Sequence, residues 1–434
     1  MDKFNKKLIP PQQQLSNLLE HFKNGRFSEA EKLATFISQE FPCHNFSWKI
    51  LGAVFKATGR KSEAINANQT AVALAPQDAE AHSNLGITLQ ELGRLNEAEA
   101  SCREAIALAP NLAEAHNNLG NSLKELGRLE EAQVSYLQAI ALKPDVAQPF
   151  NNLGLTLKEL GKLNEAEDSY TQAIVLKPDY AEARYNLGIT LQELGKLNEA
   201  EASYTHAIAF KQDYAEAKHM LAALTGKTTA TAPRVYVEVL FDNYAARFEN
   251  SLVNNLEYKI PKAITEILIK DSKFDLLGSI IDLGCGTGLF GMEVKQFCKH
   301  LEGVDLSKKM LDKAKEKNIY NKLIKQDIIT YLSNENLNFD CFIATDVFIY
   351  IGDLCDVFQL IKSRNKTGGK LAFSTEDYDG EGFILEQSGR YSHSKKYIEN
   401  LCEKFGYKLR YFENQNLRKE KNRYIRGGLY LLDF

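Results

Sequence analysis

The segment IDLGCGTGLFG (residues 281–291) combines an apolar run, an acid and closely spaced glycines. The apolar residues predict a strand that ends at Leu283, and Gly284, Gly286 and Gly288 predict a tight loop after it. Glycines at alternate positions let the backbone lie against a ligand, because a Cβ there would collide with it. Such a loop suits a phosphate, a sugar or an amino-acid-like group, which makes this segment the first candidate for chemistry.

Three ligand classes compete for this loop. A phosphate-binding P-loop needs a lysine after its last glycine, and none stands there, so this class is excluded. GTGLFG (286–291) is a literal G-x-G-x-x-G, the dinucleotide-binding pattern. Its register is poor, because counting from the turn at Gly284 places Leu289 at the third glycine position. The third class is S-adenosylmethionine (SAM).

The string D-L-G-C-G-T-G resembles motif I of the class I SAM-dependent methyltransferases. EGVDLSKKMLDKAK places Asp305 after a second strand, where an acid can accept hydrogen bonds from both ribose hydroxyls, and its D-x-S-x-x-M-L-x-x-A run also resembles this family. The resemblance implies that Asp327, in KQDIITY, contacts the adenine amino group. It also implies that Asp346, in the motif IV-like FDCFIATDVFIYIGDL, lies near the donor methionine.

The resemblance therefore implies one set of cofactor-binding residues: Asp282, Gly284, Cys285, Gly286, Thr287, Gly288, Asp305, Leu306, Asp327, Ile328, Asp346 and Tyr244. Each has a plainer alternative. Asp305 or Asp327 alone could be a helix cap, since Asp is favoured there, and Asp346 could be a strand-end turn residue. Cys285 is interpreted as a small loop residue and not as a nucleophile. Order and spacing together favour SAM.

The elements before this loop form a repeat array. Glycine, alanine and proline each recur with a period of 34 residues, glycine at 25, 59, 93, 127, 161 and 195. Each unit holds two helical patterns that join at the glycine, and a proline such as Pro110 ends the second helix. The units resemble tetratricopeptide repeats. Six repeats and a terminal helix are expected over residues 11–226.

An asparagine row follows the same period. The sequence N-L-G recurs with Asn84, Asn118, Asn152 and Asn186. Similar rows in the protein O-GlcNAc transferase family lie on the concave face of the array, which implies here that the amides pair with an extended peptide backbone. The alternative is that each asparagine bonds within its own repeat.

The rest of the chain predicts a different architecture. Residues 227–235 are small and polar and read as a linker. Over 236–434, helical patterns alternate with short apolar runs, which predicts a Rossmann-like α/β sheet, mostly parallel. The last two strand patterns have no helix between them and predict an antiparallel hairpin. The expected fold is thus a two-domain chain: an all-α tetratricopeptide solenoid followed by an α/β class I methyltransferase.

Segments 232–261, 350–354 and 389–409 extend the resemblance over nearly the whole chain, to bacterial predicted methyltransferases that contain tetratricopeptide repeats. It implies a lid over the SAM pocket made of four aromatic residues: Tyr236, Phe241, Tyr244 and Phe248. The second F-D of that family reads F-E here, at Phe248 and Glu249. The alternative is that the aromatic residues only anchor an N-terminal helix.

The polar residues of these segments form a candidate acceptor site: Tyr350, Asp353, Glu376, Arg390 and Tyr391. His393 is the candidate general base, since the pKa of histidine lies near neutral, although a structural place at a helix N-terminus is its alternative. Methyl transfer can proceed by in-line positioning, so a base is not required. The motif IV position reads T-D-V-F (345–348) where amide and amine methylases carry N-P-P-Y, and the acceptor is left open.

Bulk properties limit the functional classes. The chain has 434 residues and a formal charge of −4, so broad nucleic-acid binding is not expected. No apolar run of 18 residues predicts membrane insertion. Seven scattered cysteines without C-x-x-C spacing predict no metal site and a reducing, cytoplasmic setting.

Three functional hypotheses follow from this reading. The first is a SAM-dependent methyltransferase whose array recruits a protein or peptide. The alternatives are a scaffold with a non-catalytic SAM-sensing domain, and a small-molecule methyltransferase that assembles through its repeats.

Overall fold

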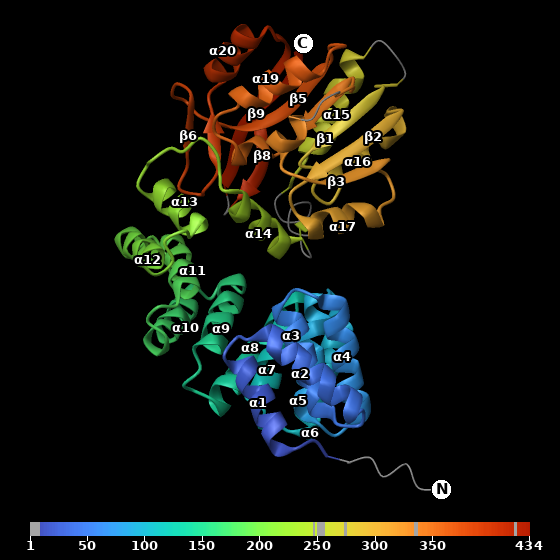
Figure 1. Ribbon diagram of the computed structural model, residues 1–434. Coiled ribbons are helices and arrows are strands. Elements are labelled where there is room, and N and C mark those ends of the chain that lie inside the picture. The colour runs from blue at the N-terminus through green and yellow to red at the C-terminus, as the bar shows by residue number, and fades with distance from the viewer. Residues whose placement is uncertain (1–8, 246–247, 250–256, 273–275, 334–336, 421–422) are drawn as a thin grey trace. The chain divides into compact units, whose positions relative to one another are not determined.

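The computed structural model describes residues 9–245, 248–249, 257–272, 276–333, 337–420 and 423–434. The chain divides into two compact units, Met1–Ala200 and Glu201–Phe434 (Figure 1). The division falls within helix α12 (Leu197–Phe210). The limits expected from the repeat period, 11–226 for the solenoid, 227–235 for the linker and 236–434 for the second domain, stay a prediction.

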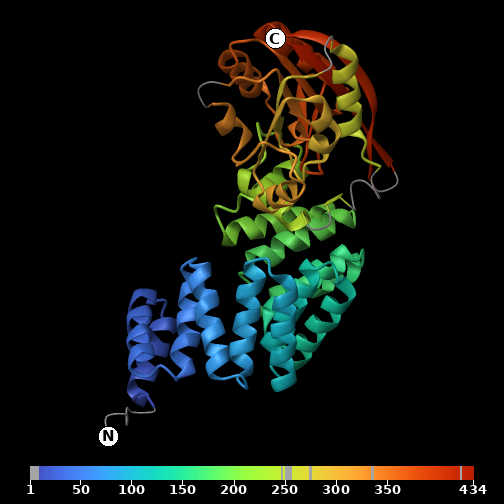
Figure 2. The same ribbon diagram turned by 90° about the vertical axis from the view of Figure 1, so that its right-hand side faces the viewer.

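The first unit is an array of paired helices, as the 34-residue period predicts (Figure 2). Its helices are α1 (Gln12–Lys23), α2 (Phe27–Glu40), α3 (Asn45–Ala57), α4 (Lys61–Leu74), α5 (Ala79–Glu91), α6 (Leu95–Leu108), α7 (Ala113–Glu125), α8 (Leu129–Leu142), α9 (Ala147–Glu159), α10 (Leu163–Leu176) and α11 (Ala181–Glu193). Gly93 ends α5 with φ of 73°, and the N–H of Arg94 then donates to the carbonyl of Leu89 at 2.9 Å. This left-handed C-cap turns the chain into α6.

Small residues let the two helices of a repeat approach closely. A Cβ at Gly120 would lie 2.6 Å from the ring of Tyr136, and one at Gly154 would lie 2.7 Å from Tyr170. Both tyrosine side chains are fully buried. A larger residue at either glycine would separate the helices, which explains the recurrent glycine of N-L-G.

The asparagine row bonds between repeats. Asn118 donates from Nδ2 to Oγ of Ser83 at 3.0 Å. Asn152 and Asn186 donate to the amide oxygens of Asn117 and Asn151, each at 3.1 Å. The alternative in which each asparagine bonds only within its own repeat is therefore not the arrangement found for these three residues.

The described residues of the second unit form a nine-stranded sheet. Its strands are β1 (Ser279–Leu283), β2 (His300–Asp305), β3 (Lys322–Lys325), β4 (Cys341–Ala344), β5 (Lys370–Asp377), β6 (Phe383–Leu385), β7 (Tyr391–His393), β8 (Lys408–Glu420) and β9 (Arg423–Asp433). The order β3-β2-β1-β4-β5 is parallel throughout, and β9 adds to β5 antiparallel and pairs with β8. The predicted mostly parallel sheet with a C-terminal antiparallel hairpin is confirmed.

Helices cover both faces of this sheet, as its strands, apolar on both sides, require. They are α13 (Ala215–Leu224), α14 (Arg234–Tyr244), α15 (Ile260–Asp271), α16 (Leu289–Val294), α17 (Lys308–Glu316), α18 (Ile328–Leu332), α19 (Cys355–Arg364) and α20 (Lys395–Phe405), with short 3-10 turns η2 (Lys295–Phe297) and η3 (Phe348–Tyr350). One core holds Phe342 of β4 against α18, α19 and α20. The other holds Ile343 against α15 and α16. The order of strands reverses between β1 and β4, and the carboxyl ends of such strands bind ligands in open α/β sheets.

The segment expected as a linker is bonded to the second unit. The N–H of Ala232 donates to the carbonyl of Tyr350 at 3.1 Å, and the N–H of Asp353 donates to the carbonyl of Ala230 at 2.8 Å. Residues 227–235 therefore lie against the sheet edge that holds the candidate site.

Candidate functional site

The glycine loop follows β1 and is tied to β2. Gly284, Gly286 and Gly288 have φ of 72°, 52° and 90°, a region that other residues rarely adopt. A Cβ at Gly284 would collide with the side chain of Val347. The N–H of Gly284 donates to the carbonyl of Val304 at 2.7 Å. The backbone freedom inferred for these glycines is the freedom the loop uses.

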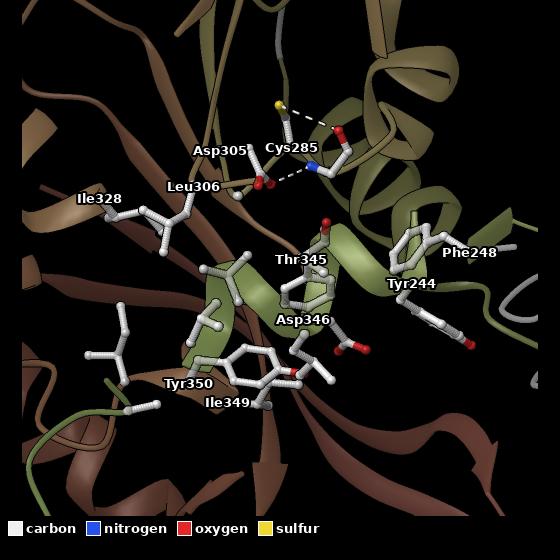
Figure 3. A pocket seen from close by; sticks show the side chains of 18 of the residues that line it. Tyr244, Phe248, Cys285, Asp305, Leu306, Ile328, Thr345, Asp346, Ile349 and Tyr350 are labelled. Carbon is white, nitrogen blue, oxygen red and sulfur yellow. Dashed lines mark hydrogen bonds between the residues drawn. The ribbon is translucent and has the colours of Figure 1, made fainter. Parts of the chain in front are cut away.

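Asp305 closes this loop from the end of β2. Its Oδ2 accepts the N–H of Gly286 and its Oδ1 accepts the N–H of Ser307, both at 2.8 Å (Figure 3). Burial raises the pKa of this carboxyl to about 6, although the two N–H groups oppose the shift. The carboxylate is thus held in one orientation at the rim of a cavity.

Asp282 has a different place. It is fully buried below the loop, and burial raises its pKa to about 7. The hydroxyl of Tyr320 donates to its Oδ2 at 2.6 Å, while its Oδ1 has no hydrogen-bond partner among the described residues. Asp282 does not line the cavity, so its contact with the loop is from behind.

The cavity has a volume of about 470 Å³, within the range of small-molecule sites. Ten of the expected cofactor residues line it: Tyr244, Gly284, Cys285, Gly286, Thr287, Asp305, Leu306, Asp327, Ile328 and Asp346. Asp282 and Gly288 are not among the lining residues. The loop and the ends of β2, β3 and β4 thus meet at one opening (Figure 3).

Asp327 carries out the plainer role and also faces the cavity. Its Oδ1 accepts the N–H of Thr330 at 3.0 Å, which caps α18, and also accepts Nη2 of Arg234 at 2.9 Å. Asp327 therefore combines a helix cap with an ion pair to α14.

Helix α14 is held across the cavity by polar residues four positions apart. Arg234 pairs with Asp327, Glu238 accepts from Lys325 at 2.7 Å, and Asp242 accepts the hydroxyl of Ser307 at 2.5 Å. This spacing puts the three side chains on one helix face.

The aromatic residues expected as a lid divide between two places. Phe241, Tyr244 and Phe248 line the cavity, and the rings of Phe241 and Tyr350 are 5.3 Å apart. Tyr236 does not line it and packs on His219, with ring centroids 4.8 Å apart.

A chain of buried ion pairs occupies the far end of the cavity. Arg418 donates from Nη1 to Asp346 at 2.7 Å and from Nη2 to Glu376. Arg390 donates from Nε to Glu376 at 2.8 Å and from Nη2 to Glu420 at 2.6 Å. Sequence reasoning named Asp346, Glu376 and Arg390 but missed Arg418 and Glu420, because both lie on β8 in a hairpin without a recognisable motif.

Asp346 itself is in an unusual backbone conformation. Its φ is 55°, which is rare for a residue with a side chain. Its N–H donates to Oγ of Ser374 at 2.9 Å, and the Ser374 hydroxyl is 3.2 Å from Oδ1 of Asp346. Strain held by surrounding bonds is frequent at functional sites.

Three of the residues expected at the acceptor site lie outside the cavity lining. His393 is fully buried, its Nε2 lies 2.9 Å from the carbonyl of Gly352, and burial lowers its pKa to about 4. Asp353 accepts the hydroxyl of Tyr397 at 2.9 Å, and the hydroxyl of Tyr391 lies 2.6 Å from that of Thr229. A neutral, buried imidazole bonded to backbone has the features of a structural residue, which is the alternative given for His393.

Comparison with known protein families addresses both halves. Residues 262–425 match the family model of a methyltransferase domain. Repeat models match 52–93, 120–161 and 156–195 (TPR repeat) and 79–112, 101–134 and 181–214 (tetratricopeptide repeat). The chain carries tetratricopeptide repeats and a methyltransferase domain.

Curated relatives match this chain in part. It is 27% identical over 146 residues to an uncharacterized methyltransferase of Schizosaccharomyces pombe, covering 29% of this chain and 51% of that protein. It is 30% identical over 142 residues to a malonyl-[acyl-carrier protein] O-methyltransferase of Ilyobacter polytropus, covering 31% and 47%. The chain thus spans about half the length of the curated relatives it matches.

Solved structures resemble it more distantly. The crystal structure of the APC/C hetero-tetramer Cut9-Hcn1 gives a TM-score of 0.47 at 20% identity, covering 51% of this chain and 44% of that one. A thermophilic TPR protein of Thermus thermophilus gives 0.38 at 26% identity, covering 42% and 99%. Both scores are below 0.5, so neither adds to the assignment. Within the described parts of the chain, no helix has the length and apolar character needed to cross a membrane.

Proposed function

We propose that this chain is a SAM-dependent methyltransferase whose repeat array recruits a protein or peptide partner. The observation that carries the proposal is the pairing of Asp305 with the N–H of Gly286 at the rim of the cavity. A Cβ at Gly286 would meet no atom nearer than Phe248 at 3.8 Å, so the loop backbone faces open space that a ligand can fill.

The residues around the cavity fit a nucleoside joined to an amino acid. Bound SAM would supply an electrophilic methyl group on a sulfonium. Asp305 is the acid for the ribose hydroxyls, since each of its oxygens accepts one N–H and keeps capacity for another bond. Asp327 and Ile328 are the residues for the adenine, and Asp346 is the residue for the methionine end.

Recruitment by the array is the second part of the proposal. The Nδ2 groups of Asn118, Asn152 and Asn186 are used between repeats, so a peptide would be recognised through the amide oxygens of this row. Concave surfaces of this kind are the usual binding surfaces of repeat arrays.

Calorimetric titration of the full chain with SAM tests the cofactor. We expect saturable binding that Asp305→Ala weakens roughly 10- to 100-fold, as expected for losing hydrogen bonds to a charged group. Asp312→Ala is the matched control, because Asp312 pairs only with Lys308 on the exposed surface of α17 among the interactions described. Absence of binding by the unmodified chain would refute the proposal.

Production of S-adenosylhomocysteine separates an enzyme from the SAM-sensing scaffold. The full chain is incubated with SAM and cell extract, and S-adenosylhomocysteine is measured. Formation above that of the Asp305→Ala variant supports transfer, whereas tight SAM binding without product supports the scaffold.

A further inference from the structure

The far end of the cavity is built from charged side chains that alternate in sign. The order is Asp346, Arg418, Glu376, Arg390 and Glu420, and each arginine bridges two acids. Arg418 and Glu376 are the innermost members, with side chains 6% and 7% exposed. Three acids and two arginines leave this chain of ion pairs one negative charge in excess.

Glu420 is the exchangeable member of the set. Its side chain is 33% exposed, and the described residues hold it through one ion pair, to Nη2 of Arg390. Arg390, Arg418 and Glu420 all line the cavity. A partly exposed ion pair contributes little free energy, so an entering carboxylate can compete for the guanidinium. The guanidinium suits it, because its planar donors match carboxylate geometry.

The described lining residues include no histidine and no lysine. Burial raises the pKa of Cys285, Tyr258 and Tyr350 above their ordinary values, so these groups stay protonated near neutral pH. The carboxylates of Asp346 and Glu420 are each engaged by a guanidinium. Asp305, the remaining acid with a raised pKa, is held against the glycine loop by two N–H groups.

We infer that the methyl acceptor carries a carboxylate, which replaces Glu420 on Arg390. The inference rests on the proposed function, since an acceptor requires a methyl donor. An ionised carboxylate is already nucleophilic at neutral pH and needs no base, whereas an alcohol or an ammonium group must lose a proton. The exchange also conserves charge, because one carboxylate leaves Arg390 as another arrives.

The reaction is balanced without a further reagent. One oxygen of the acceptor carboxylate stays on Arg390, and the other forms the bond to the methyl carbon. The carbon–sulfur bond breaks with its electron pair on sulfur. The products are a methyl ester and S-adenosylhomocysteine, and no proton is gained or lost.

A cationic acceptor fits the same surface less well. Every acid in the set is bonded to a guanidinium, so an ammonium group that approaches Asp346 or Glu420 meets Arg418 or Arg390 at the same place. Like charges at that separation repel strongly away from water.

Three five-carbon probes test the inference on the full chain saturated with S-adenosylhomocysteine. Glutarate presents carboxylates, glutaramide is its neutral analogue and 1,5-diaminopentane is its cationic analogue. By calorimetry we expect glutarate to bind and the other two to bind at least about tenfold more weakly, since a charged pair contributes more than a neutral bond. Glu420→Gln should tighten glutarate binding by about fivefold, because the competing internal carboxylate is gone. Arg390→Gln should abolish it.

Glu413→Gln is the matched control on the same strand. Glu413 accepts the hydroxyl of Tyr411 at the exposed surface and should leave glutarate binding unchanged. Unchanged affinity for S-adenosylhomocysteine shows that each variant is folded. Tighter binding of the diamine, or glutarate binding that ignores Glu420→Gln, overturns the inference alone. A chain that binds no S-adenosylhomocysteine refutes the proposed function as well.

The bond formed provides an independent readout. Methyl esters hydrolyse in mild alkali and release methanol, whereas N-methyl bonds do not. With tritiated SAM and cell extract, label that alkali converts to volatile methanol supports the carboxylate acceptor, and alkali-stable label overturns it.

Discussion

Arg418→Met should destabilise the second unit by about 3–5 kcal/mol, the cost of removing one partner from a buried ion pair. Arg418 is 6% exposed and is bonded to two acids, Asp346 and Glu376, which are 16% and 7% exposed. Methionine fills a similar volume but leaves both carboxylates without this guanidinium. Among the contacts of the described residues, only Arg390 then remains on the Glu376 carboxylate and only Ser374 on that of Asp346.

Thermal unfolding of the full chain followed by circular dichroism measures this loss. For a unit of this size, the change corresponds to a lowering of Tm by roughly 6–20 °C. Trp48, the single tryptophan of the sequence, lies in the first unit, so its fluorescence reports that unit separately. The loss should therefore appear in the dichroism transition assigned to the second unit.

Arg410→Met is the matched control for Arg418→Met. Arg410 lies on the same strand, is 41% exposed and pairs with Asp271 and Asp433 at the surface. Its removal should change the free energy of unfolding by no more than about 1 kcal/mol. Equal effects of the two substitutions, or a stable Arg418→Met variant, would refute the view that the buried acids depend on Arg418.

Three further predictions concern single positions. Gly389→Ala should destabilise by about 1–3 kcal/mol more than Gly382→Ala in urea unfolding, because both have left-handed φ but only the first Cβ would approach Tyr236, at 2.7 Å; equal losses would contradict this. His393, whose pKa falls from 6.5 to about 4 on folding, contributes stability above pH 6.5 that is lost as pH falls toward 4, so about 2 kcal/mol should disappear between pH 7 and 5. His393→Gln should remove that part of the pH dependence, and urea midpoints at both pH values check it. SAM affinity should fall below about pH 6 as Asp305 becomes protonated, and calorimetry of Asp305→Asn should lack this titration.

Local pattern was sufficient for most of the fold. The 34-residue period identifies the helix pairs, because glycine and alanine must recur wherever two helices of a repeat meet. The glycines after β1 and the acids after β2 and β3 are adjacent to their strands, so their place at one sheet edge follows from parallel topology. These residues could be named from sequence because each belongs to the element that positions it.

Other assignments depended on properties that local pattern does not encode. His393 lies three residues after Arg390, yet only Arg390 lines the cavity, and complete burial makes the histidine a poor base. The asparagine row shows the same limit, because its bonds run to the preceding repeat. Burial and cross-repeat contacts arise only when the elements pack.

The sequence by itself determined the repeat array, the α/β sheet and the glycine loop, since each follows from residues close together in the chain. Tertiary structure alone decided the charged end of the cavity. Arg418 reaches Asp346 across 72 positions because β9 pairs with β5 and β8 pairs with β9, with a register shift between Asn416 and Arg418. A bulge of this kind redirects the following side chain, and its place depends on long-range pairing that no local pattern records.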